Sequence, residues 1–137
     1  RAAKVFDKVL VTIARNTKKE PLFSVEERIM FIEDATQHLP NVSPDSFEGL
    51  LVSYAQKNNA VAIIRGLRAI SDFEFEFQMA LMNRRLNNEI TTVFLMPHEK
   101  YTYLNSSIVR EVVEFGGNVE KLVTPLVAEK LREKFLK

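Results

Sequence analysis

Three short runs of continuous apolar residues constrain the fold of this chain more than any other feature. The runs are residues 8–14 (KVLVTIA), 60–64 (AVAII) and 91–96 (TTVFLM), and each contains β-branched side chains. Runs of this length, bounded by polar loops or by proline, are typical of strands. Because apolar residues follow one another instead of alternating with polar ones, we expect both faces of each strand to be buried, as in a parallel sheet.

Segments with helical features lie between these strands. Ser24 and Glu27 have the spacing of a capping box, and apolar residues then recur at helical intervals until Pro40. Further elements are expected as a short strand over 42–47 and helices over 49–57, 72–86, 107–115 and 125–136. The alternation predicts an α/β fold: a doubly wound, Rossmann-like parallel sheet with helices on both faces, in a single domain over residues 1–137.

The N-terminal residues do not have the pattern of a domain start. The chain opens with RAAKVF, without a Met and without a capping residue. Two alanines followed by Val5 and Phe6 are typical of the end of an amphipathic helix that is already under way. We therefore expect the domain to be N-terminally incomplete at Arg1.

Composition argues against several classes of protein. The 137 residues include no Cys, which excludes disulfides and permits a reducing compartment. A net charge of +1 argues against a broad nucleic-acid surface, and no apolar run approaches the roughly 20 residues of a membrane helix. There is no P-loop and no Gly-x-Gly-x-x-Gly motif. We assign no role to His38 or His98, and we expect a cytoplasmic protein with no metal site formed by side chains and with no nucleic-acid or membrane partner.

Candidate site residues lie in the segments that follow the three strands, over 15–23, 65–71 and 97–107. In doubly wound folds, ligands bind beyond the carboxyl ends of the strands. In the first segment, Lys18 and Lys19 could hold a phosphate, although a solvated loop is the commoner explanation of two adjacent lysines.

The second segment, Arg65-Gly66-Leu67-Arg68, is the most informative. An Arg at the end of a buried strand is costly without an anionic partner, and its guanidinium matches two phosphate oxygens at once. Gly66 lets the backbone approach a ligand closely. The alternative is an ion pair that caps a helix or joins an interface.

Two further features concern helices. Ser106 and Ser107 stand at an expected helix start, where they could bind an anion or simply cap the helix. In the helix over 72–86, composition makes Glu76 a solvated carboxylate. We expect the apolar side chains of that helix to belong to the core: Phe73, Phe77, Ala80, Leu81 and Met82.

Together these segments resemble the pantetheine-phosphate adenylyltransferase (phosphopantetheine adenylyltransferase) family of the nucleotidyltransferase superfamily. The resemblance runs in order over the whole chain and rests on residues 64–74 (IRGLRAISDFE), 78–84 (QMALMNR), 92–97 (TVFLMP) and 106–112 (SSIVREV). It implies transfer of the adenylyl group of ATP to 4′-phosphopantetheine, giving dephospho-coenzyme A and pyrophosphate in coenzyme A biosynthesis. The phosphate of phosphopantetheine would attack the α-phosphorus of ATP directly, with Mg²⁺ as cofactor and catalysis by positioning and charge neutralisation.

The resemblance also implies roles for individual residues. Lys19, Leu51 and Arg65 would bind the substrate, with Lys19 on its phosphate and on the transferring phosphoryl group. Arg68 would hold the phosphates of ATP. The residues implied to bind ATP are Gly66, Leu67, Arg68, Glu76, Tyr101, Thr102, Tyr103, Leu104, Asn105, Ser106 and Ser107. A homohexamer is implied, with dephospho-coenzyme A or coenzyme A as feedback ligand.

Two departures from the family pattern affect these expectations. Asn105 stands where the family usually has Ser, so the middle of that loop would bond phosphate differently. The family's Thr-x-Gly-His motif, whose His stabilises the transition state, has no match here, so no catalytic residue is assigned and we expect a chain beginning at Arg1 to be inactive. The alternatives are a sister nucleotidyltransferase acting on nicotinate mononucleotide or glycerol phosphate, and a non-catalytic nucleotide- or coenzyme A-binding module.

Overall fold

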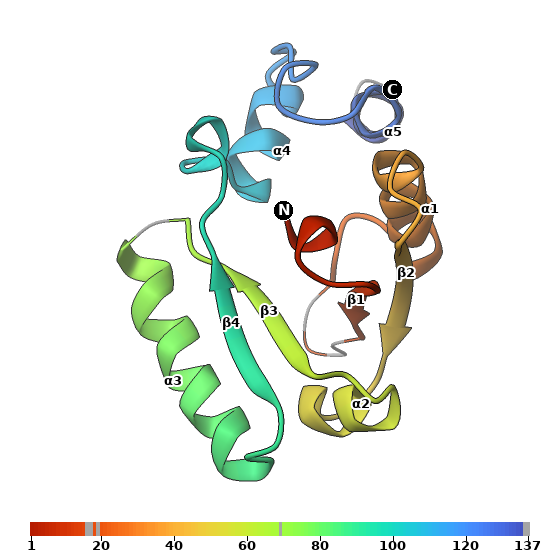
Figure 1. The fold of residues 1–137 in the computed structure, drawn as a ribbon. Coiled ribbons are helices and arrows are strands. Elements are labelled where there is room, and N and C mark those ends of the chain that lie inside the picture. Colours follow the sequence, from red (N-terminus) through yellow and green to blue (C-terminus); the bar gives the residue numbers. More distant parts are fainter. Residues whose placement is uncertain (16–17, 19, 69, 136–137) are drawn as a thin grey trace. The chain divides into compact units, whose positions relative to one another are not determined.

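The computed structural model describes residues 1–15, 18, 20–68 and 70–135. In these residues strands alternate with helices (Figure 1). The strands are β1 (Val9–Ala14), β2 (Val42–Phe47), β3 (Ala62–Gly66) and β4 (Thr91–Leu95). The helices are α1 (Val25–Thr36), α2 (Leu51–Lys57), α3 (Ile70–Leu86), α4 (Ser106–Glu114) and α5 (Pro125–Phe135), with 3-10 turns η1 (Ala2–Lys4) and η2 (Glu99–Tyr101).

This order of elements confirms the α/β fold class. β3 begins two residues later than predicted and includes Arg65 and Gly66, so Arg65 is the penultimate residue of the strand and does not follow it. At the N-terminus a 3-10 turn, closed by a hydrogen bond from the Lys4 N–H to the Arg1 carbonyl, replaces the α-helix end that was expected.

Parallel ladders join the strands in two pairs. β1 pairs with β2 from Val9 opposite Val42 onward, and β3 pairs with β4 from Ala62 opposite Thr91 onward. No ladder connects the two pairs within the described ranges, so two two-stranded sheets stand where one sheet was expected. Because both ladders are parallel, the segments that follow paired strands leave from the same end of each pair.

Local sequence signals set the ends of two helices. α1 begins with the predicted capping box: the Glu27 N–H donates to Ser24 Oγ at 3.1 Å, and the Ser24 N–H donates to Glu27 Oε2 at 2.7 Å. α4 ends in a Schellman motif, in which Gly116 has a φ of 75° and the Gly117 N–H donates to the Val112 carbonyl at 2.7 Å.

The chain divides into two compact units, Arg1–Pro97 and His98–Lys137, and each has its own buried residues. In the first unit, Val52 and Ala55 of α2 pack with Ile63 of β3 and Ile90, and Leu51 and Ala60 lie against this cluster. In the second unit α4 contacts α5. The buried side chains of this unit are Val109, Val113, Val119, Ala128 and Leu131. The single domain over 1–137 stays a prediction.

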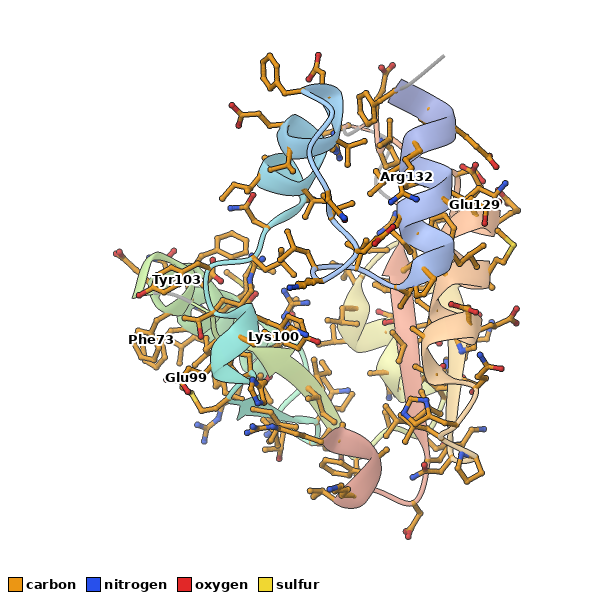
Figure 2. All side chains as sticks on the ribbon, turned by 90° about the horizontal axis from the view of Figure 1, so that it is seen from above. Phe73, Glu99, Lys100, Tyr103, Glu129 and Arg132 are labelled. Carbon is orange, nitrogen blue, oxygen red and sulfur yellow. The ribbon has the colours of Figure 1, made fainter. Side chains whose placement is uncertain are left out.

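Helix α3, which runs beside β4 (Figure 1), corrects the expectation of a buried aromatic stripe. Phe73, Phe77, Leu81 and Met82 are exposed instead of buried, and Ala80 is only partly buried. The ring of Phe73 points away from the ribbon (Figure 2). Among the side chains of α3 that the structure describes, the buried one is Glu76, with 9% of its surface exposed. α3 is helical, as its apolar spacing predicts, but the face that packs is the one that carries the carboxylate of Glu76.

Candidate functional site

The carboxyl end of β3 brings Arg65 and Glu76 together. Arg65 Nε donates to Glu76 Oε2 at 2.7 Å, and Arg65 Nη2 donates to Glu76 Oε1 at 2.5 Å. The Glu76 side chain is buried, whereas 45% of the Arg65 side chain remains exposed. The hydrogen bonds that Arg65 donates to Glu76 raise the pKa of Arg65, so the guanidinium stays charged. Glu76 is therefore not the solvated carboxylate that composition indicated.

Arg68 has a weaker carboxylate partner. Its Nε donates to Asp72 Oδ2 at 3.1 Å across one turn, and both side chains are partly exposed, Arg68 at 47% and Asp72 at 32%. An exposed pair of this kind contributes little to stability and exchanges easily for another anion. The i, i+4 spacing of Arg68 and Asp72 is a signal that sequence reasoning could have used and did not.

Gly66 and Leu67 link the two arginines. Gly66 is the last residue of β3, opposite Leu95, and a Cβ added to it would meet no atom within 4 Å. Packing therefore does not require glycine at this position, and the space beside its backbone is open to a ligand.

A contact between Arg15 and Ser46 lies at the carboxyl end of β1 and β2. Arg15 donates from Nε and Nη2 to Ser46 Oγ at 3.2 and 3.1 Å. Lys19, the predicted phosphate ligand, lies outside the described residues. Leu51, predicted to contact the pantetheine arm, begins α2 and packs partly against the buried cluster of that unit. Sequence reasoning missed the Arg15–Ser46 contact, which joins positions 31 residues apart.

The segment from Tyr101 to Ser107 belongs to the second unit. Asn105 is the N-cap of α4, with its Oδ1 accepting the Ile108 N–H at 2.9 Å, and Ser106 and Ser107 are the first two helical residues. The helix start therefore lies one residue before the predicted one. The capping role goes to Asn105, so the hydroxyls of Ser106 and Ser107 are not used as the N-cap.

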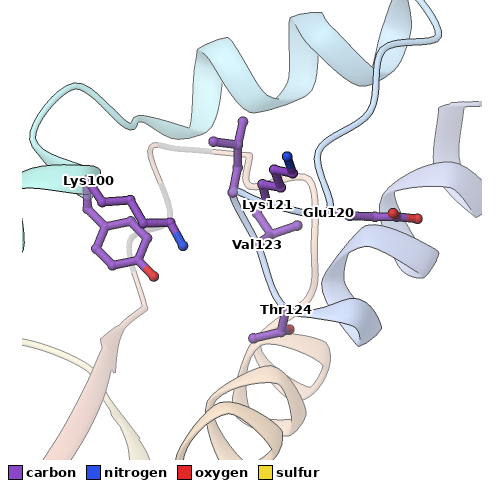
Figure 3. A pocket seen from close by; sticks show the side chains of 7 residues that line it. Lys100, Glu120, Lys121, Val123 and Thr124 are labelled. Atoms are coloured by element: carbon purple, nitrogen blue, oxygen red, sulfur yellow. The ribbon is translucent and has the colours of Figure 1, made fainter.

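The same unit contains a pocket of about 420 Å³ (Figure 3). Lys100 and Tyr101 line it together with residues 120–124. The Lys100 ammonium lies 5.1 Å from the centre of the Tyr101 ring, a cation–π distance. Arg132 donates to Glu120 at 2.5 Å, which offsets the negative charge at this wall. With Lys121 also on the lining, the pocket is suited to an anionic group.

The structure thus brings some predicted site residues together within one unit. Arg65 meets Glu76, and Arg68 follows on the same segment. The loop predicted to bind ATP, residues 101–107, lies in the second unit. Within the described ranges, no three His, Asp or Glu side chains gather where they could hold a metal ion. Nor does any helix there combine the length and apolar character that crossing a bilayer requires.

The chain is also similar in sequence to known proteins. A family model of cytidylyltransferase-like proteins matches residues 1–112. Over all 137 residues the chain is 53% identical to a phosphopantetheine adenylyltransferase of Caldanaerobacter subterraneus subsp. tengcongensis, and the match covers 86% of that relative's length.

Proposed function

This chain belongs to the cytidylyltransferase-like family and, within it, to the phosphopantetheine adenylyltransferases, and on that premise we propose that it transfers the adenylyl group of ATP to 4′-phosphopantetheine. The products are dephospho-coenzyme A and pyrophosphate. The observation that carries the proposal is the pair of guanidinium groups on Arg65-Gly66-Leu67-Arg68 at the carboxyl end of β3. Beside them the backbone is open at Gly66.

The chemistry that suits these residues is direct displacement. A phosphate oxygen of phosphopantetheine attacks the α-phosphorus of ATP, the bond to the β-phosphate breaks, and pyrophosphate leaves. Charge spreads over phosphate oxygens in the transition state, and positioned cations stabilise it. Lys19 and Arg65 bind the phosphopantetheine side of the site, with Leu51 on the pantetheine arm, and Arg68 binds the phosphates of ATP.

The remaining ATP contacts come from two segments. Gly66 contributes open backbone at the strand end, with Leu67 next to it, and residues 101–107 contribute backbone and hydroxyl groups at the start of α4.

A divalent cation accompanies this class of reaction, and we propose Mg²⁺. Among the described site residues the cations are Arg65 and Arg68, and the carboxylate of Glu76 already pairs with Arg65, which suits a polyanion but not a bare cation. Mg²⁺ would therefore be held by the phosphate oxygens of ATP, where it neutralises part of their charge.

Assembly and regulation extend the proposal. We propose a cytoplasmic homohexamer that takes dephospho-coenzyme A or coenzyme A as feedback ligand. Support for assembly comes from α3, whose large apolar side chains are exposed in the single chain. Exposed apolar area of this kind marks interaction surfaces.

The direct test is an adenylyl-transfer assay on the purified full enzyme, and not on a chain beginning at Arg1, with ATP and one of three acceptors. We expect pyrophosphate release with phosphopantetheine and none with nicotinate mononucleotide or glycerol phosphate. Transfer to either of the other acceptors would make the protein a sister nucleotidyltransferase. ATP binding without transfer to any acceptor would make it a binding module.

The variant Lys19→Ala tests whether Lys19 acts on the transferring phosphoryl group. A cation beside the transferring group acts mainly in the transition state, so turnover should fall far more than ATP affinity. Lys57→Ala removes the same charge at an exposed position of α2 and serves as the matched control. Equal losses of turnover in the two variants, or a loss of ATP affinity as large as that of turnover, would contradict the role of Lys19.

A further inference from the structure

Glu76 is a buried carboxylate whose position needs a physical reason. It lies on α3 with 9% of its surface exposed. A carboxylate in that environment is costly unless it is paired and hydrogen-bonded. Arg65 supplies both conditions, because it donates one hydrogen bond to each carboxylate oxygen, at 2.7 and 2.5 Å.

We propose that Glu76 is a positioning residue, which holds the Arg65 guanidinium in the orientation that binds the phosphate group of the acceptor substrate. This inference rests on the proposed adenylyl transfer. Under this inference Glu76 does not contact ATP, and it affects substrate binding only by orienting Arg65.

The donor geometry of Arg65 supports this role. A guanidinium has five N–H donors in one plane, and the pair with Glu76 occupies one on Nε and one on Nη2. Three donors, two on Nη1 and one on Nη2, lie on the edge that does not face Glu76. Because almost half of the Arg65 side chain is exposed, these N–H groups can donate two hydrogen bonds to a phosphate in a second bidentate contact.

The two ends of the pair are anchored independently. Arg65 is held in the β3–β4 ladder opposite Phe94, and Glu76 is held on α3. With both backbones fixed, the two hydrogen bonds set the plane of the guanidinium as well as its position. This pre-organisation reduces the rotamer entropy that an exposed Arg loses when it binds an anion.

A direct ATP contact suits Glu76 poorly. Both of its oxygens already accept hydrogen bonds from Arg65, and little of its surface can be reached from outside. A carboxylate placed against a triphosphate would also repel it.

A double-mutant cycle on the full enzyme separates these roles. The variants are Glu76→Gln, Arg65→Gln and the double variant, with KM for each substrate and kcat measured for all. We expect Glu76→Gln to raise KM for phosphopantetheine by about tenfold or more, the scale of a hydrogen bond to a charged group. KM for ATP should change by less than about threefold. In the Arg65→Gln background, Glu76→Gln should add no further change, because residues that act through each other are not additive.

The controls distinguish three failures. Glu74→Gln makes the same substitution at an exposed position of α3 and should leave all constants unchanged. If Glu76→Gln lowers the melting temperature but leaves both KM values at wild-type levels, the pair is structural only and the inference is wrong. A rise in KM for ATP that persists in the Arg65→Gln background would show a direct ATP contact and also overturns it. A wild-type enzyme that forms no dephospho-coenzyme A would instead overturn the proposed function.

A second variant and a spectroscopic measurement cover the case in which Glu76→Gln does not fold. Glu76→Asp keeps the charge but withdraws the carboxylate by one methylene, so it should fold and still raise KM for phosphopantetheine. The Arg65 Nε–H signal in nitrogen-15 NMR, identified by its loss in Arg65→Gln, should exchange slowly with water in the wild type. Faster exchange in Glu76→Asp supports positioning, and an unchanged signal with an unchanged KM contradicts it.

Discussion

Arg65 and Arg68 lie three residues apart, yet their carboxylate partners hold them differently. Arg65 donates two hydrogen bonds to a buried carboxylate, and Arg68 donates a hydrogen bond of 3.1 Å to a partly exposed one. The first pair is therefore rigid, and the second can be exchanged for the phosphates of a nucleotide at small cost. The two arginine side chains are about equally exposed, at 45% and 47%, so the difference comes from the burial of their carboxylate partners.

The role proposed for Arg68 predicts the effect of replacing it with another cation. Arg68→Lys keeps the charge but loses the planar fork, so ATP affinity should fall by about 1–3 kcal/mol, as measured by titration calorimetry. Arg84→Lys makes the same substitution at an exposed position of α3 and is the control. Unchanged affinity in Arg68→Lys would remove this residue from the ATP site.

A tyrosine–aspartate pair between α2 and β2 predicts a pH dependence. The Tyr54 hydroxyl donates to Asp45 Oδ2 at 2.5 Å. The hydrogen bond from Tyr54, with a second from the Ser46 N–H, lowers the pKa of Asp45 below its ordinary value of 3.8. Burial, followed by the bond to Asp45, raises the pKa of Tyr54 to about 12. Folding therefore favours the ionised Asp45 and the protonated Tyr54.

Tyr54→Phe should consequently lower the free energy of unfolding at pH 7 by about 1–2 kcal/mol, the value of a partly exposed hydrogen bond to a charged group. For Asp45, whose pKa is lowered, the stabilisation is present above the unfolded pKa and is lost as the pH falls through the folded value. For Tyr54, whose pKa is raised, it is lost between about pH 10 and 12. Urea unfolding at several pH values measures the difference. The control Tyr103→Phe, at an exposed ring, should show no such pH dependence. The prediction is wrong if Tyr54→Phe unfolds with the same free energy as the wild type, or if the difference in unfolding free energy does not change with pH.

Among the elements, α4 depends on its C-terminal glycines. A Cβ added to Gly117 would lie 2.6 Å from Val112 Cγ1 and 2.8 Å from the Val112 carbonyl oxygen. Because the second of these atoms belongs to the backbone, Gly117→Ala must distort the end of the helix. We expect a loss of about 1–3 kcal/mol, the usual cost of overpacking, in urea or thermal unfolding.

Gly116 provides the comparison for this prediction. It has a φ of 75°, but a Cβ there would meet no atom within 4 Å. Asn tolerates this left-handed conformation, so Gly116→Asn should cost much less than Gly117→Ala. If the order of the two losses were reversed, backbone conformation rather than the close contact would limit this turn.

For the whole molecule, the exposed apolar residues of α3 are the feature that bears on assembly. Phe75, with 61% of its surface exposed, begins a stripe that continues at intervals of four, three and four residues through Met79, Met82 and Leu86. A single chain gains little by presenting such a stripe to water, and a second copy can cover it.

Phe75→Asp places a charge in this stripe and should prevent assembly. We expect a mass near six chains for the wild type by size-exclusion chromatography with light scattering, and a smaller species for the variant. Phe115→Asp, the same substitution at an exposed ring outside α3, should keep the wild-type mass. A monomeric wild type would refute the proposed assembly, and a hexameric Phe75→Asp would place the interface elsewhere.

The order of the elements and the ends of several of them follow from the sequence alone. Strand composition, the Ser24–Glu27 capping box and the Gly116–Gly117 pair act over a few residues, so their effects can be predicted without knowing what packs against them. The family also follows from local motifs, of which residues 64–74 are the most specific.

Burial and pairing across long distances came only from the tertiary structure. Arg65 and Glu76 are 11 residues apart, on a strand and a helix, and no periodicity connects them. The aromatic positions of α3 have helical spacing, which shows that they share faces but not which face is covered. The elements that pack on the helix decide which face is covered. Here Glu76 is on the covered face, because a paired carboxylate, unlike an unpaired one, can be buried beside the end of β3.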